Sequence, residues 1–191
     1  DAGAEDTKIV FDGNAQDWHI GLDDSADDLV IGLGSTLGTT THMSFDETGA
    51  VLKPLQPAFL VRPASNQSNI AIDTDVTVVF GTEIFDQNAD FASNTFTAPV
   101  AGRYNISCGL SCGAVDSAMT YFVHRFRFSN RNFDLYYGGE YIDADGMITF
   151  TASMLVDMDA SDTVSVEAVQ AGGTQQLDIR TDSYFSGYLV C

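Results

Sequence analysis

Residues 84–107 read IFDQNADFASNTFTAPVAGRYNIS, and residues 184–190 near the end of the chain read YFSGYLV. Both stretches are rich in aromatic and apolar residues and are bounded by turn residues, a pattern typical of β-strands. Pro99 and Gly102 interrupt the first stretch, so we expect one strand to end and a new one to begin there. The two stretches predict an antiparallel all-β domain.

The same stretches resemble a known family. The segment FTAPVAGRYNIS resembles the F-T-x-P-x-x-G-x-Y signature of the C1q-like, tumour-necrosis-factor-like jelly rolls, and the closing FSGYLV is similar to the F-S-G-Y/F-L-L with which those domains end. The residues that carry the signature are Phe91, Phe96, Pro99, Gly102, Tyr104, Phe185, Gly187 and Tyr188. The resemblance implies a homotrimer whose subunits meet along apolar and aromatic sheet faces.

Further strand-like runs follow the first stretch, separated by turns of Gly, Asn and Asp at a spacing that fits a two-sheet jelly roll. No segment has helical periodicity. We expect a short strand at Phe96 and further strands at residues 76–80, 103–114, 119–129, 133–137, 147–157, 163–170, 176–180 and 184–190. The predicted fold class is a C1q/TNF-like two-sheet jelly roll.

The first part of the chain differs in kind. It contains only very short strand-like runs, at residues 8–12, 18–22, 28–33, 42–45 and 50–52, and it has eleven acidic residues up to Lys53 against two lysines. Strands this short in so acidic a segment cannot close a core within one chain, although three copies wrapped around one another could. The segment resembles the stalk or collar regions of trimeric viral and phage fibre proteins.

A proline-rich run, LKPLQPAFLVRPAS, separates the two parts and is typical of a stiff linker. Within it, the run from Ala58 to Val61 matches the segment that opens the jelly roll in the family. We therefore expect two domains. Residues 1–57 form a short-stranded trimeric β stalk or collar with its linker, and residues 58–191 form the jelly roll.

The charge of the chain excludes some functions. The net charge is −19 with only 8 Lys and Arg residues, which argues against binding nucleic acid through its phosphates. No run approaches the roughly 18 apolar residues of a membrane helix, so we expect no membrane insertion. Because the chain begins at Asp1, we expect it to be a piece of a longer protein. The three cysteines are expected to be free thiols.

Four aspartates, Asp23, Asp24, Asp27 and Asp28, lie within six residues. Sites for hard cations such as calcium need several carboxylates that converge on one point. Two interpretations remain open, a calcium site and a turn whose charges are relieved by water and salt. We expect no other cofactor.

A second cluster combines cations and tyrosines in and beside the segment NRNFDLYYGGEY. Arginines concentrated in an acidic chain normally neutralise nearby acids, here across a subunit boundary. The alternative is a site for an anionic sugar or a lipopolysaccharide phosphate, and the tyrosines suit contact with carbohydrate or protein. The candidate ligand-binding residues are Arg125, Arg127, Arg131, Tyr136, Tyr137 and Tyr141.

His124 lies in the run YFVHRFRF, where alternation places it on one face with Phe122, Phe126 and Phe128. A histidine among phenylalanines is usually an interior residue with its hydrogen bonds satisfied. The alternative is a pH-sensitive contact between subunits.

No catalytic constellation stands out, because Gly-x-Ser-x-Gly is absent and nothing selects a carboxylate pair, so we expect no enzyme. Together, the two resemblances imply the distal, receptor-binding part of a viral or phage fibre or spike. Such a module acts at the virion surface, binds a host-surface glycan or protein, and joins other virion proteins through its N-terminal side. The alternatives are a purely structural trimerisation module of a capsid or tail appendage, and a polysaccharide depolymerase.

Overall fold

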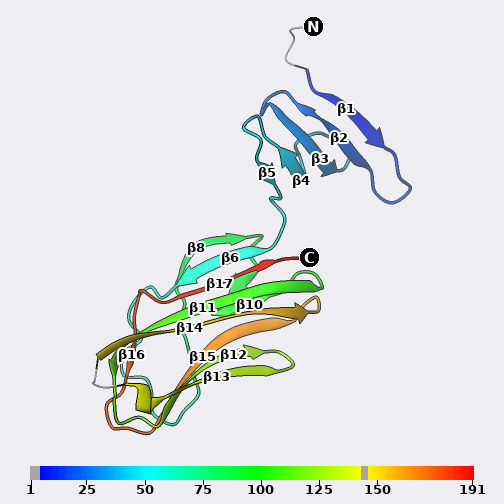
Figure 1. The fold of residues 1–191 in the computed structure, drawn as a ribbon. Coiled ribbons are helices and arrows are strands. Elements are labelled where there is room, and N and C mark those ends of the chain that lie inside the picture. Colours follow the sequence, from blue (N-terminus) through cyan, green and yellow to red (C-terminus); the bar gives the residue numbers. More distant parts are fainter. Residues whose placement is uncertain (1–4, 143–145) are drawn as a thin grey trace. The chain divides into compact units, whose positions relative to one another are not determined.

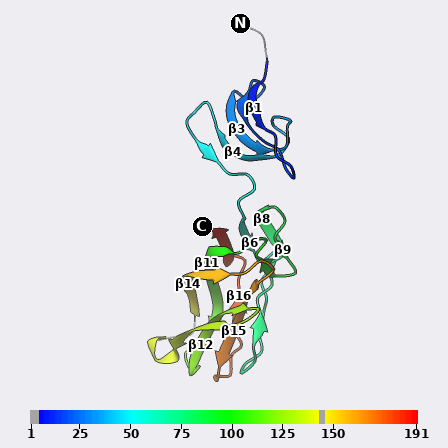
Figure 2. The ribbon, with the colours of Figure 1, turned by 90° about the vertical axis from the view of Figure 1, so that its right-hand side faces the viewer.

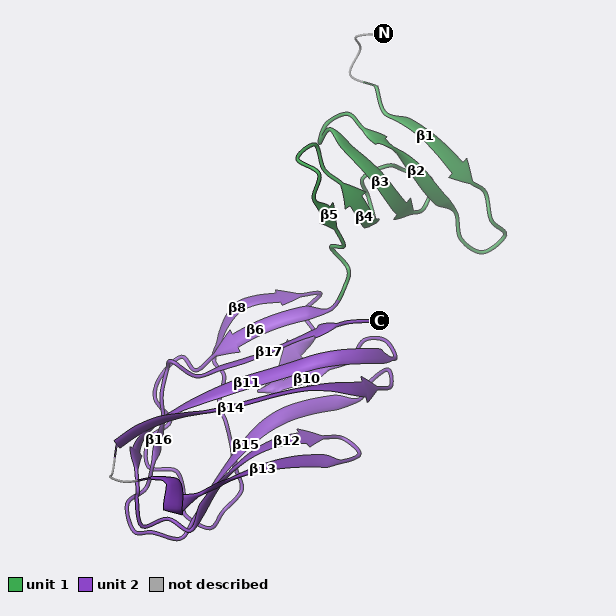
Figure 3. Cartoon of the chain, viewed as in Figure 1, with its two compact units in different colours: residues 1–56 green, residues 57–191 purple. Residues whose placement is uncertain are grey.

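The structure is a computed structural model that describes residues 5–142 and 146–191. The chain divides into two compact units, Asp1–Gln56 and Pro57–Cys191 (Figure 3). Within the described residues, both units are built from antiparallel β-strands, with one short 3₁₀ helix, η1 (Gly139–Tyr141) (Figure 1). The described part of the chain contains no helix long and apolar enough to cross a membrane. The predicted all-β architecture is confirmed.

The first unit is a single five-stranded sheet in which each strand pairs with the next one along the chain. Its strands are β1 (Thr7–Phe11), β2 (Trp18–Asp23), β3 (Asp28–Leu33), β4 (Thr41–Phe45) and β5 (Val51–Leu52). The turn before β5 contains Gly49 at a φ of 90°, which glycine adopts without strain. The short strands expected here are confirmed, and each end lies within one residue of its predicted position.

The second unit consists of two six-stranded sheets that pack on each other (Figure 2). The first sheet has the order β13-β12-β15-β10-β9, with β7 paired to β15, and the second has the order β14-β11-β17-β6-β8, with β16 paired to β11. The strands of the first sheet are β7 (Val76–Thr77), β9 (Phe91–Ala92), β10 (Thr95–Thr97), β12 (Tyr121–Phe128), β13 (Asn132–Gly138) and β15 (Thr163–Ala171). Those of the second are β6 (Ala58–Arg62), β8 (Thr82–Gln87), β11 (Gly102–Val115), β14 (Gly146–Met158), β16 (Asp178–Ile179) and β17 (Tyr184–Leu189).

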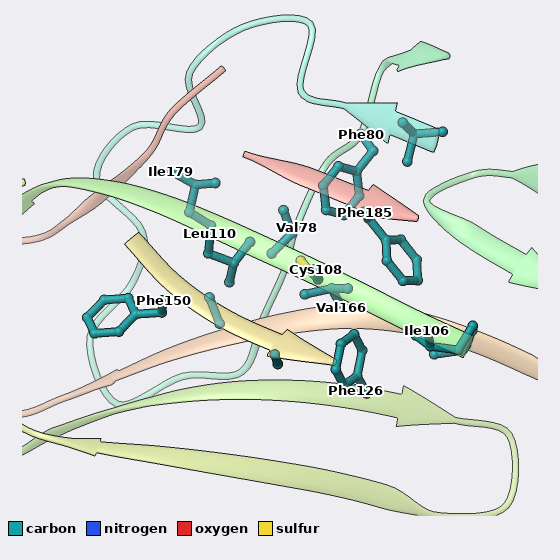
Figure 4. Close-up of a cluster of buried hydrophobic side chains, with 14 of the residues drawn as sticks. Val78, Phe80, Ile106, Cys108, Leu110, Phe126, Phe150, Val166, Ile179 and Phe185 are labelled. Carbon is teal, nitrogen blue, oxygen red and sulfur yellow. The ribbon is translucent and has the colours of Figure 1, made fainter. Parts of the chain in front are cut away.

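The core of the second unit lies between its two sheets and is rich in aromatic side chains (Figure 4). Phe59 belongs to a cluster of rings in this core: its ring stacks on Phe96 at 4.7 Å between centroids and meets Phe185 edge-on at 5.0 Å. The inward residues of β11 alternate with outward ones, and Ile106, Cys108 and Leu110 are all fully buried. The alternation of apolar and polar residues therefore determines which face of each sheet packs against the other.

The signature residues explain why this motif marks the fold. Tyr104 is fully buried and its hydroxyl donates a hydrogen bond to the carbonyl of Val100 at 2.7 Å, which fixes the turn between β10 and β11. A Cβ at Gly187 would lie 2.8 Å from both Phe59 Cε1 and Ile106 Cδ1, so only glycine lets β17 pack against these two side chains. Phe91, Phe96 and Phe185 are buried in the core.

The last strand, β17, lies in the middle of its sheet, between β11 and β6. Its side chains alternate, so Phe185 points into the core whereas Tyr188 points outward and is 51% exposed. Tyr188, although part of the sequence signature, therefore does not contribute to the core.

Two expected strands are much shorter than predicted. Of residues 76–80 only Val76–Thr77 forms a strand, β7, and of residues 176–180 only Asp178–Ile179 does, β16. Val78 and Phe80 are nevertheless buried, and the amide of Phe80 donates its hydrogen bond to Asn94 Oδ1 instead of to a neighbouring strand. An apolar run predicts burial well here, but it does not predict which hydrogen-bond partner the backbone finds.

Candidate functional site

Arg125 is the centre of an ion-pair network on the outward face of β12, β13 and β15. Its guanidinium contacts Asp75 Oδ2 at 2.6 Å, Asp134 Oδ1 at 2.7 Å and Glu167 Oε2 at 3.2 Å. The hydrogen bonds that Arg125 donates to Asp134 lower the pKa of Asp134. The bonds that Arg125 donates to Asp134, Glu167 and Asp75 raise its own pKa. Three strands and the segment before β7 are thus joined by one cation.

The other two candidate arginines are also paired within the chain. Arg127 Nη1 contacts Glu167 Oε1 at 2.9 Å, and Arg131 Nη2 contacts Asp157 Oδ1 at 3.0 Å while its guanidinium lies 5.4 Å from the centre of the Phe128 ring. The acids therefore come from the same chain, and no subunit boundary is needed to supply them. An anionic ligand would have to displace these carboxylates, so the anion-binding interpretation gains no support from the geometry.

The three candidate tyrosines lie together around an open pocket of about 330 Å³. Tyr137 packs against Phe150 at 4.8 Å between ring centroids, and its hydroxyl donates a hydrogen bond to the carbonyl of Thr151 at 2.6 Å. Burial raises the pKa of Tyr137. Tyr141 is 83% exposed. We call this site the tyrosine pocket; its lining residues are Tyr136, Tyr137, Gly138, Tyr141, Ile142, Ile148, Thr149 and Phe150.

The place of the tyrosine pocket in the fold explains its apolar lining. It lies where β13 and β14 meet, and these two strands are the end strands of the two opposing sheets. At this edge neither sheet has a further strand within residues 5–142 and 146–191 to cover the side chains between them, so part of the interior faces outward. The residue types favoured the tyrosines for binding, but their position at an open edge of the sandwich depends on the sheet topology.

A second exposed apolar surface, which the sequence analysis missed, covers the outward face of the sheet that contains β17. Cross-strand register places Leu155 and Tyr188 on either side of Asn105, and Leu60 beside Phe85. We call this surface the face patch; it consists of Leu60, Phe85, Leu155, Tyr184 and Tyr188. The alternation of YFSGYLV contained the signal, because burial of Phe185 requires both tyrosines of that run to point outward.

The acidic cluster does not form a metal site in the structure. Asp23 Oδ1 accepts hydrogen bonds from the amide and the hydroxyl of Ser25, at 3.1 and 2.6 Å, so this carboxylate caps the turn between β2 and β3. Asp27 adopts a positive φ of 56° in the same turn. Among residues 5–142 and 146–191, no group of three or more His, Cys, Asp or Glu side chains could hold a metal ion. The carboxylates of Asp24 and Asp28 therefore do not converge with others on a point where calcium could bind.

His124, Cys108 and Cys112 are interior residues, whereas Cys191 is exposed. His124 is fully buried, and among the described residues neither of its ring nitrogens has a hydrogen-bond partner, which corrects the expectation that its hydrogen bonds are satisfied. Burial lowers the pKa of His124 to about 4. Cys108 and Cys112 are buried free thiols, and burial raises the pKa of Cys112 to about 12. These thiols therefore lack the low pKa that a nucleophilic cysteine needs.

Comparison with known proteins identifies the second unit. The profile of the C1q domain matches residues 58–190. The globular domain of zebrafish complement 1qA is 18% identical in sequence, with a TM-score of 0.51 over 71% of this chain and 98% of its own. Murine APRIL at pH 8.0 is 8% identical, with a TM-score of 0.50 over 71% of this chain and 99% of its own. A search of curated protein sequences finds no match.

At these sequence identities the two structures show a shared fold alone. C1q and TNF-like domains typically form homotrimers, bind ligands or receptors, and are generally non-catalytic. The match leaves the first unit outside, so it does not test the predicted fibre context. Because the C1q domain profile spans more than half of the 191 residues, this chain belongs to the C1q domain family.

Proposed function

We propose that this chain is a homotrimeric attachment module, the distal part of a viral or phage fibre at the virion surface, which binds a host-surface glycan or protein. The observation that carries the proposal is that the second unit exposes two different apolar surfaces, the tyrosine pocket and the face patch. The first unit, which resembles a fibre stalk, supports the fibre context and would connect the module to other virion proteins.

Two different surfaces are what a closed ring of identical subunits requires. In such a ring each subunit contacts one neighbour through one surface and the other neighbour through another. The tyrosine pocket lies at the edge of the sandwich, and the face patch lies on the flat outward side of one sheet. In the proposed trimer, the edge with Tyr137 and Tyr141 packs on the face patch of the next subunit, so both apolar surfaces are buried from solvent.

The trimer is tested by light scattering on the purified chain, which should give three times 20.5 kDa. Tyr188→Asp should weaken the trimer, because the substitution places a charge in the proposed interface at a position that is exposed in the single subunit. Val79→Asp is the control, since Val79 is 49% exposed but belongs to neither surface. A folded wild-type monomer at micromolar concentration would contradict the proposal.

Attachment is tested by a glycan and host-surface binding screen with the purified trimer. Binding to a defined glycan or surface protein is the expected result, whereas a trimer that binds neither would favour the purely structural module. Turnover of polysaccharide by the same sample would favour the depolymerase. Tyr141→Ser separates the two roles of the tyrosine pocket, because loss of mass indicates a subunit contact and loss of binding alone indicates a ligand contact.

A further inference from the structure

The sheet of the first unit leaves its more apolar face uncovered. In the register of β1 to β4, Ile9, Ile20, Ile31 and Met43 are successive cross-strand partners, so their side chains form a continuous apolar band across four strands. The side chain of Ile9 in this band is 63% exposed.

The rows on either side of this band have the same character. Leu22, Leu29 and Phe45 are cross-strand partners on one side, and Phe11, Trp18 and Leu33 are partners on the other. The central band and these six residues, all within the described part of the chain, include no charged side chain. We call these three rows the stalk face. An exposed apolar surface of this extent marks a site of association.

The opposite face of the same sheet is covered within the chain over β2, β3 and β4, whereas β1 stays exposed. The loop of residues 34–40 folds over it, and Leu37 and Val30 are buried there. A Cβ at Gly21 would lie 2.6 Å from Leu37 Cδ1, and a Cβ at Gly32 would lie 2.6 Å from the carbonyl oxygen of Thr40. Glycines on this face therefore let the loop approach closely. The sheet covers its smaller residues and exposes its larger ones, which is the reverse of what an isolated domain requires.

We propose that the stalk face packs against the same face of two further copies of this chain, so that three single sheets enclose one shared apolar interior. This inference rests on the proposed homotrimer. It extends that proposal to the first unit, which lies outside the matched C1q domain. Three sheets arranged around a threefold axis present equivalent faces to the interior, as closed symmetry demands.

The chain itself argues for copies as the occupants. The first unit continues into β6 of the second unit through the short segment 53–57, so three associated second units hold three first units at high effective concentration. If only two stalk faces paired, the third would remain exposed, whereas a threefold arrangement covers all three equally.

The distribution of charge is compatible with this packing. The clustered acids of the first unit lie at the ends of its strands: Asp23 ends β2, Asp28 begins β3, Asp24 and Asp27 lie in the turn between them, and Asp46 follows β4. Packing of the stalk faces therefore buries no carboxylate. The repulsion between copies acts at the rim, where water and salt screen it.

Trp18 provides the test, because it is the single tryptophan of the chain and belongs to the stalk face. In one chain it is 40% exposed. In the wild-type trimer its fluorescence should be blue-shifted and poorly quenched by acrylamide. Ile9→Lys should abolish most of this shielding, because it places a charge in the enclosed interior. Val10→Lys is the matched control, since Val10 is 37% exposed and pairs with His19 of the covered face.

The mass of the same samples separates this inference from the proposed function. A particle of three times 20.5 kDa whose Trp18 is quenched equally in the wild type and in Ile9→Lys would overturn the inference and leave the trimeric C1q domain standing. A wild-type monomer would overturn both, and a dimer would overturn the threefold arrangement. Equal loss of shielding in Ile9→Lys and Val10→Lys would also overturn it, because the effect would then not depend on the face.

Discussion

The strands of both units alternate apolar and polar residues, but the apolar face is buried in the second unit and exposed in the first. In the second unit a second sheet covers the inward side chains, so Phe59, Phe96 and Phe185 are fully buried. In the first unit there is one sheet and a short loop, so Phe11 and Trp18 remain exposed. An alternating strand thus specifies which side chains share a face, but burial of that face depends on whether the chain supplies a second layer.

This contrast predicts different costs for the same substitution. Phe185→Ala should destabilise the second unit by about 3–5 kcal/mol, because it leaves a cavity among closely packed rings. Phe133→Ala is the control, since Phe133 is 38% exposed and belongs to neither the tyrosine pocket nor the face patch. The measurement is urea unfolding followed by tyrosine signals, because all seven tyrosines lie in the second unit. Equal effects of the two substitutions would show that burial in the sandwich does not decide stability.

The second unit is expected to lose stability in acid through its buried histidine. The folded second unit holds His124 with a pKa lowered to about 4, whereas an unfolded histidine titrates near 6.5. Above pH 6.5 the residue is neutral in both states, so its titration does not change the free energy of unfolding. As the pH falls from 6.5 to 4, the unfolded chain binds the proton first, so stability is lost.

The loss from His124 should reach about 3 kcal/mol at pH 4, given about 1.4 kcal/mol for each unit of pKa difference. His124→Leu should remove this part of the pH dependence. The comparison is read from urea midpoints of the second unit at several pH values between 7 and 4. Parallel pH profiles of the wild type and His124→Leu would contradict the role assigned to His124.

Much of the second unit could be predicted from the sequence, because local residues determine it. The turn at Pro99 and Gly102 and the alternation around Phe185 depend on neighbours in the chain, and the predicted strands are confirmed except that those at residues 76–80 and 176–180 are reduced to two residues each. The candidate site was less predictable. The tyrosine pocket arises because β13 and β14 are the end strands of their sheets. Arg125 forms ion pairs with Asp75 and Glu167, which are far away in sequence. Such relations exist only once the topology is known.

The ion-pair network of Arg125 predicts a smaller effect within the second unit. Arg125→Met keeps much of the packing volume but leaves Glu167, which is nearly buried, with fewer charged partners. We expect a loss of about 2 kcal/mol, the usual size for hydrogen bonds to charged groups. Arg62→Met is the control, since Arg62 is an exposed cation at the end of β6. A similar small effect of both substitutions would mean that the network contributes little.

The smallest effect is expected in the acidic turn of the first unit. Because Asp24, Asp27 and Asp28 do not converge on a common point, millimolar calcium should raise the thermal midpoint of Trp18 fluorescence no more than magnesium does. Both ions should instead act like added sodium chloride at equal ionic strength, by screening carboxylates at the rim of the proposed stalk. Asp28→Asn should leave the midpoint unchanged in calcium. A calcium-specific increase that disappears in Asp28→Asn would contradict this, and would mean that assembly brings together carboxylates that a single chain keeps apart.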